Sequence, residues 1–215
     1  MADALQVVGR SLERDSTGQG VVRSLIGTPD GSLFTADYVL SKALEGRIFH
    51  AILGGFSTPT TFRVAIDEDQ PEMVIDVPTG TTIIPISIQA HLEASAGTIT
   101  EIVALANPAL VGGTATTGTL LSSRLGSGRT SSCVYRYTYS GNGTAPASYI
   151  EFWHAGVAFA DAVTEPTRMY AWDYRNAAPV VIVGPGALVV HIGATGTAPT
   201  GYAQLAFMEF ASAMI

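Results

Sequence analysis

Hydrophobic and polar residues alternate along much of this chain with the period of two that is typical of β-strands. The longest such stretch covers residues 82–93, and no helix keeps this period over that length. We predict that its apolar side chains share one face of a strand; they are Ile84, Ile86, Ile88, Ala90 and Leu92.

Shorter stretches of the same kind follow one another, separated by Gly, Pro, Asn and Asp, the residues that favour turns. One short helix is expected at residues 37–44. Segments rich in Gly, Ser and Thr, at residues 112–119 and 126–132, are predicted to be loops. The predicted strands are residues 47–53, 61–66, 73–77, 82–93, 98–106, 134–139, 149–154, 168–174, 180–183, 187–192 and 202–210.

Short strands at close spacing indicate an antiparallel sandwich or barrel rather than βαβ units. The chain of 215 residues is about twice the size of an immunoglobulin domain and lacks its Cys-Trp-Cys spacing. A strand, a Pro/Gly turn and a long apolar strand occur twice, at residues 75–84 and 182–190, and two Greek keys would place equivalent hairpins in the two halves of the chain. An up-and-down barrel and an immunoglobulin-like sandwich remain alternatives, and we predict an all-β antiparallel β-sandwich of the jelly-roll type.

The first residues differ from the rest of the chain. Residues 1–32 mix charged residues with glycines and show no sustained hydrophobic period. We therefore predict an extended N-terminal arm over residues 1–43 and a single β-sandwich domain over residues 44–215.

Composition suggests a protein that assembles with others. Charged residues make up 13% of the chain and apolar residues 47%, against about 25% charged residues in an ordinary domain. Much of the surface must be neutral, or covered by another subunit. Lys42 is the only lysine against ten arginines, and arginine suits contacts between subunits. The net charge of −7 argues against a nucleic-acid partner.

The sequence also argues against a membrane partner. The N-terminus carries acidic residues and no apolar h-region, so we expect no secretory signal and synthesis in a cytoplasm. Residues 177–194 contain no Asp, Glu, Lys or Arg and are about long enough to span a bilayer. The turn Gly184-Pro185-Gly186 divides them into two runs of strand length, so no transmembrane segment is expected.

No enzyme motif stands out. The loops Gly18-Gln19-Gly20 and Gly126-Ser127-Gly128 lack the spacing of phosphate-binding loops, and no nucleophile elbow occurs. His91, Glu93 and His191 could form a minimal metal site, but the H-x-H pair of metal-binding cupins is missing. The acidic loop with Asp67, Glu68, Asp69 and Glu72 could hold Ca²⁺, but the regular spacing of ligands is absent. We predict no enzyme activity, no cofactor, and no catalytic, cofactor-binding or metal residue.

Two further features have an ordinary and a functional interpretation. Cys133 is the only cysteine, which excludes an intrachain disulfide, and we predict that it is a buried apolar residue. Tyr135, Tyr137 and Tyr139 alternate with other residues and are predicted to share one strand face. Such a face could stack on sugars, although aromatic rings pack in cores and interfaces more often.

Three stretches carry a resemblance to a known class of protein. They are residues 44–53 (LEGRIFHAIL), residues 78–94 (PTGTTIIPISIQAHLEA) and residues 179–210 (PVVIVGPGALVVHIGATGTAPTGYAQLAFMEF). They resemble jelly-roll virion proteins of tailed bacteriophages, particularly capsid cement or decoration proteins. The resemblance covers roughly residues 44–210 and rests on these phrases rather than on a diagnostic motif.

The resemblance implies a non-enzymatic virion structural protein, often a homotrimer, that binds the outer surface of an icosahedral capsid and stabilises contacts between capsomers. Its expected location is the capsid surface of the virion, after synthesis in the host cytoplasm. The implied partners are the major capsid protein and copies of itself. We predict that Arg10, Arg14 and Arg23 of the arm contact carboxylates on the capsid. A receptor- or carbohydrate-binding fibre or tail head, and a single jelly-roll capsid subunit, remain alternatives.

Overall fold

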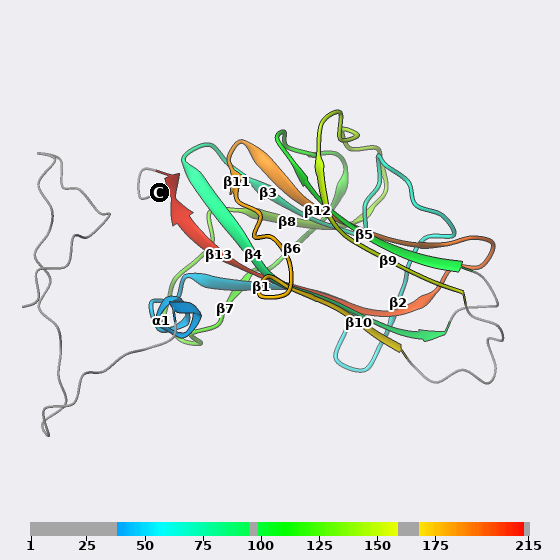
Figure 1. The fold of residues 1–215 in the computed structure, drawn as a ribbon, viewed down its shortest axis with the longest axis horizontal. Helices are drawn as coiled ribbons and strands as arrows, with labels where there is room; N and C mark the ends of the chain where they lie inside the picture. Colours follow the sequence, from blue (N-terminus) through cyan, green and yellow to red (C-terminus); the bar gives the residue numbers. More distant parts are fainter. Residues whose placement is uncertain (1–37, 95–98, 159–167, 213–215) are drawn as a thin grey trace, which may run out of the picture.

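The structure is a computed structural model that describes residues 38–94, 99–158 and 168–212, and strands dominate it (Figure 1). The described elements in chain order are α1 (Tyr38–Leu44), β1 (Ile48–Leu53), β2 (Thr60–Thr61), β3 (Met73–Val77), β4 (Thr81–Ala94), β5 (Ile99–Asn107), β6 (Ala115–Gly118), β7 (Leu121–Ser122), β8 (Val134–Tyr139), β9 (Ile150–Ala158), β10 (Arg168–Asp173), β11 (Ile182–Val183), β12 (Gly186–Ala194) and β13 (Thr200–Ala211).

The strands form two antiparallel sheets that pack against each other (Figure 1). The seven-stranded sheet has the order β10-β4-β13-β1-β7, with the short strands β11 and β2 beside β4 and β13. The six-stranded sheet has the order β6-β8-β3-β12-β5-β9. The predicted all-β antiparallel sandwich is therefore confirmed.

Eight of the strands pair in a nested order. The first, β1, pairs with the last, β13, and inside this pair β3 pairs with β12, β4 with β10, and β5 with β9. Successive pairs alternate between the two sheets. The pairs β13–β4 and β12–β5 then join these pairs within each sheet. This nesting agrees with the jelly-roll type, which stays a prediction.

Apolar side chains from both inner faces fill the space between the sheets. Phe49 of β1 and Phe207 of β13 are buried with their ring centroids 6.0 Å apart. Trp172 of the seven-stranded sheet meets Phe152 of the six-stranded sheet edge to face, at 5.0 Å. Cys133 belongs to this core, which confirms that it is a buried apolar residue.

The alternation predicted for residues 82–93 reverses inside β4. Its C-terminal half faces the core as predicted, but Ile84 and Ile86 belong to a second cluster on the other face of the sheet, beside α1. The pairing of β13 with β4 shifts register between Ala206 and Phe207. A bulge moves the side chains beyond it to the opposite face. The prediction of a single shared face is therefore wrong for Ile84 and Ile86.

Two predictions about shorter segments are also wrong. The strand expected at residues 61–66 is reduced to β2 and a single parallel bridge between Arg63 and Gly193, and the Glu72 carboxylate accepts the backbone N–H of Arg63 at 3.0 Å. The loop expected at residues 112–119 contains β6, which pairs with the edge of β8. Gly118 allows this pairing, since a Cβ atom there would overlap the ring of Tyr135.

The predicted short helix is confirmed as α1. Its side chains Val39 and Ala43 pack on the outer face of the seven-stranded sheet, against a cluster that includes Ile48 and Met208. Residues 38–43 of the predicted arm are therefore helical. Residues 1–37 of that arm lie outside the described residues.

Candidate functional site

The C-terminal end of α1 is closed by a glycine turn. Gly46 has a φ of 71°, a conformation that glycine adopts without strain. Its N–H donates to Ala43 O at 2.9 Å, and the N–H of Arg47 donates to Lys42 O at 2.9 Å. This pair of bonds is a Schellman motif, which ends the helix and directs the chain into β1.

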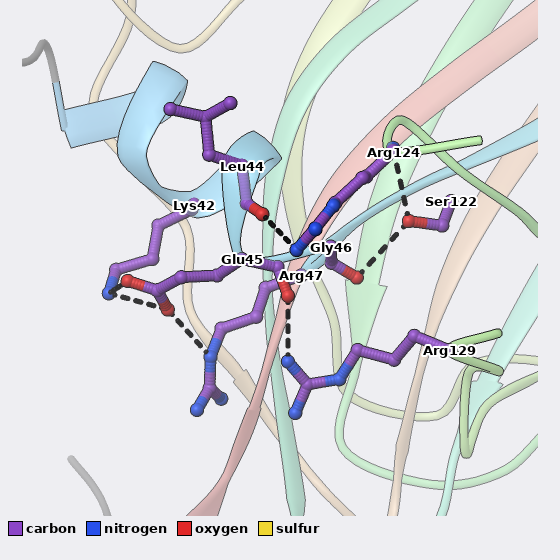
Figure 2. A network of polar contacts seen from close by, with 8 residues as sticks. All are labelled: Lys42, Leu44, Glu45, Gly46, Arg47, Ser122, Arg124 and Arg129. Atoms are coloured by element: carbon purple, nitrogen blue, oxygen red, sulfur yellow. Dashed lines mark hydrogen bonds and ion pairs between the residues drawn. The ribbon is translucent and has the colours of Figure 1, made fainter. Parts of the chain in front are cut away.

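Two arginines from the segment between β7 and β8 hold this helix end (Figure 2). Arg124 Nη1 donates to Leu44 O at 3.0 Å, and Arg129 Nη1 donates to Glu45 O at 2.9 Å. Such terminal carbonyls lack partners within a helix and carry partial negative charge, so cations bind them well. Ser122 Oγ adds a bond to Gly46 O at 3.3 Å.

The carboxylate of Glu45 lies between two further cations (Figure 2). Lys42 Nζ is 2.8 Å from Glu45 Oε1, and Arg47 Nε is 2.9 Å from Glu45 Oε2. Partial burial acts to raise the pKa of Glu45, but the hydrogen bond with Lys42 and the charges of Lys42 and Arg47 outweigh it and lower the pKa. Glu45 therefore stays ionised and neutralises only part of the surrounding charge.

The four basic side chains Lys42, Arg47, Arg124 and Arg129 are called the cationic cluster below. Beside it lies a cleft of about 290 Å³, lined in part by Arg47, Arg129 and Glu209. Glu209 accepts hydrogen bonds from Ser131 Oγ and from the N–H of Ser132, the latter at 3.0 Å. Four cations thus meet two carboxylates, in a protein whose net charge is −7. The cluster is the part of the described surface best suited to bind an acidic partner.

Sequence reasoning missed this cluster. The predicted capsid contacts Arg10, Arg14 and Arg23 lie outside the described residues. The loop around Gly126 and Gly128 lacks a phosphate-binding motif, and the signal that points to the cluster is the pair of arginines that flanks the glycines, Arg124 and Arg129.

The structure does not bring the weighed metal ligands together. His91 is exposed on the outer face of the seven-stranded sheet, stacked on Tyr202 at 6.1 Å between ring centroids. His191 is buried on the outer face of the six-stranded sheet, between Val190 and Ile192 of the core. In the described ranges, no group of three or more His, Cys, Asp or Glu side chains is placed to hold a metal ion.

The carboxylates of the acidic loop also lie apart from one another. Glu72 is buried and bonds the N–H of Arg63, whereas Glu68 is exposed. Asp67 Oδ1 accepts the N–H of Asp69 at 3.1 Å, and Asp69 Oδ2 accepts from Asn142 Nδ2 at 3.3 Å. The four carboxylates therefore do not converge on one point.

The predicted tyrosine face is wrong for one of its members. Tyr135 is buried in the core between the sheets, with Tyr137 stacked beside it at 5.3 Å between centroids. Tyr139 belongs to a cluster with Val74 and Val189 on the outer face. Thr138 has a φ of 48°, and this turn of the backbone changes the side on which the next side chain lies. These rings pack with apolar side chains and offer no sugar-stacking stripe.

Comparisons with protein-family models, with curated proteins and with solved structures find no match for this chain. In the part of the chain that the structure describes, no helix has the length and apolar character needed to cross a bilayer. The function is therefore argued from the fold and the surface of the chain itself.

Proposed function

We propose that this chain is a non-enzymatic structural protein of a virion, a cement or decoration protein that binds the outer surface of an icosahedral phage capsid. In this role it stabilises contacts between capsomers and associates with copies of itself. The observation that carries the proposal is the cationic cluster at α1, the point where the N-terminal segment joins the sandwich.

The cluster supports the proposal because it concentrates charge at a single corner of an acidic, Lys-poor protein. Four of the basic side chains lie there, and the sequence before α1 adds Arg10, Arg14 and Arg23. Arginine binds carboxylates through two parallel hydrogen bonds, which suits a stable contact with an acidic protein surface.

The fold supports the proposal by analogy. The nested strand pairing is the one that a jelly roll requires, and the sequence resemblance is to jelly-roll virion proteins.

Exposed apolar side chains at both ends of the sandwich add a third argument. Leu125, between β7 and β8, and Phe56, between β1 and β2, both project into solvent. Large exposed apolar side chains at loop tips are typical anchors of protein interfaces, where they become buried. A subunit that binds neighbours on a capsid would cover them.

Binding to empty shells tests the proposal. The shells are assembled from the major capsid protein of the virion to which this chain is proposed to belong, and the full-length chain is mixed with them and sedimented. We expect saturable co-sedimentation, with the triple variant Arg10→Gln, Arg14→Gln, Arg23→Gln binding at least about tenfold more weakly because charge-assisted bonds are lost.

A matched control replaces acidic residues in the same segment: Asp3→Asn, Glu13→Gln and Asp15→Asn should not weaken binding. Failure of the intact chain to bind shells would refute the proposal. Closed shells formed by the purified chain alone would instead identify a capsid subunit, and glycan binding without shell binding would identify a fibre or tail head.

A further inference from the structure

We propose that the loop carrying Leu125 and the cationic cluster docks on the acidic end of a second copy of this chain, so that copies associate head to tail. This inference deepens the self-association part of the proposed function and names its two contact surfaces. It stands on charge and shape complementarity between the two ends of the sandwich.

The first surface is a projecting loop. Leu125 is 84% exposed at its tip. Arg124 and Arg129 flank the tip and bond Leu44 O, at the end of α1, and Glu45 O, just beyond it, which fixes the loop on the body of the protein. Each guanidinium has five N–H donors, and so each has donors left for a partner. An apolar knob is thus held between two cations in a preorganised loop.

The second surface is a hollow at the opposite end of the sandwich. It is broad and shallow, with a volume of about 760 Å³, and its apolar lining includes Val64 and Ile66. Val64 is 54% exposed. Asp67 and Glu68 also line the hollow and supply negative charge. It therefore offers an apolar floor with carboxylates for a leucine flanked by arginines.

The charge of the hollow is available to a partner. Arg63 also lines the hollow, but its Nη2 donates to Tyr139 O at 3.1 Å and its Nε lies 3.8 Å from Glu72 Oε1. Within the described ranges, no lysine or arginine forms an ion pair with Asp67 or Glu68. A guanidinium from a second copy would meet these carboxylates.

The two surfaces cannot meet within one molecule. The segment with the acidic hollow precedes β3, and the cleft beside the cationic cluster includes Gly80, just after β3. Strand β13 also runs from the end with the acidic hollow to the end with the cleft. It begins at Thr200, which pairs with Thr61, and ends at Ala211, which lines the cleft. Its twelve residues span about 40 Å. Figure 1 shows α1 at the left end of the sandwich and β2 in its right half.

Contact between unlike surfaces has consequences for the assembly. Such a heterologous contact closes into a ring when the rotation between copies permits, and extends into a filament when it does not. The net charge of −7 makes copies repel elsewhere, so this pairing of unlike charges also selects the orientation in which they approach.

Sedimentation velocity of the full-length chain tests the inference. At about 100 µM protein and about 50 mM salt we expect oligomers. Leu125→Ser and Glu68→Lys should each raise the dissociation constant at least about tenfold, and added salt should act in the same direction. Leu125→Met should associate as the native chain does, since it keeps an apolar knob.

The controls are Ile52→Ser and Glu101→Lys, which make the same changes at exposed side chains elsewhere, and they should leave association unchanged. A native chain that stays monomeric under these conditions overturns the inference. Weakening by only one of Leu125→Ser and Glu68→Lys overturns the pairing of these two ends. Because no shells are present, self-association without shell binding would refute the proposed function alone, and the reverse result would refute this inference alone.

Discussion

Glu72 is a buried carboxyl group, and its contacts in the fold offset only part of the free-energy cost of burying its charge. Burial raises the pKa of Glu72 to about 7, although the charge and the backbone N–H of Arg63 act to lower it. In the unfolded chain the group ionises at its ordinary, lower pKa. The stability that Glu72 contributes is therefore fully present below about pH 4.5 and is lost as the pH rises through 7.

Replacing Glu72 by Gln should remove this loss. The amide oxygen can still accept the Arg63 N–H, and no charge is buried at any pH. We expect Glu72→Gln to unfold at a similar free energy to the native chain near pH 4.5, and to be more stable by about 1–3 kcal/mol at pH 8.5. Urea unfolding at both pH values measures this difference.

The difference in the free energy of unfolding between the native chain and Glu72→Gln isolates the contribution of Glu72, whereas either pH curve alone does not. Burial lowers the pKa of His191 to about 4, so its contribution is present above pH 6.5 and is lost as the pH falls through 4. The exposed neighbour Glu68, replaced by Gln, should change stability little at either pH. A Glu72→Gln protein less stable than the native chain at pH 8.5 would contradict the expectation.

At the scale of the elements, β4 and β13 approach each other unusually closely. Their pairing shifts register between Thr200 and Gly201. A Cβ atom on Gly201 would overlap the carbonyl oxygen of His91 in β4 and lie 3.0 Å from Leu92 Cα. Backbone atoms in the middle of a sheet cannot move aside cheaply, so this position requires glycine.

Gly201→Ala should therefore destabilise the protein by about 2–4 kcal/mol. The matched control is Gly156→Ala in β9, where a Cβ atom would meet nothing within 4 Å, and which should change the stability by less than about 0.5 kcal/mol. The midpoints of urea unfolding compare the two variants. Equal effects at the two glycines would show that the β4–β13 approach is not tight.

Strand β8 shows a second local constraint on an element. Thr138 has positive φ, which is unfavourable for a β-branched residue, and it lies between rings on opposite faces of the sheet. The buried carboxylate of Asp76, in the neighbouring strand β3, forms hydrogen bonds that stabilise β8. It accepts from Arg136 Nε at 2.8 Å and from the N–H of Val111 at 2.9 Å. Packing and these hydrogen bonds offset the conformational strain at Thr138.

At the scale of the whole molecule, the nested pairing ties the beginning of the described chain to its end. Strand β1 pairs with β13, so the seven-stranded sheet is complete only when the last strand is in place. The core is also shared, because Phe152 and Trp172 meet across the two sheets. These features favour unfolding in one step.

We accordingly expect a single cooperative transition. Tryptophan fluorescence reports on Trp153 in β9 and Trp172 in β10, which belong to different sheets, and far-UV circular dichroism reports on all strands. The two signals should give coincident midpoints and equal free energies in urea. Separate transitions would show that residues 44–215 contain more than one folding unit.

Strand positions followed from the sequence where the pattern was long or strongly apolar. Residues 73–77 and 134–139 are strands with the predicted limits, and the longer stretch at 82–93 extends by one residue at each end. The predictions of strands and loops are wrong where a contact with a residue outside the segment determines its structure. The carboxylate of Glu72 accepts the backbone N–H of Arg63, and a Gly- and Thr-rich segment pairs with β8 to form β6.

By itself the sequence determined the class of the fold, the turns and the burial of Cys133, because period-two alternation and turn residues act locally. Tertiary structure alone decided which face each side chain occupies beyond a bulge, as at Ile84, Ile86 and Tyr139. It also assembled the cationic cluster, since Arg124 and Arg129 lie about eighty residues from the carbonyls at the end of α1 that they bind. Such meetings depend on how strands far apart in sequence pair, which no local pattern encodes.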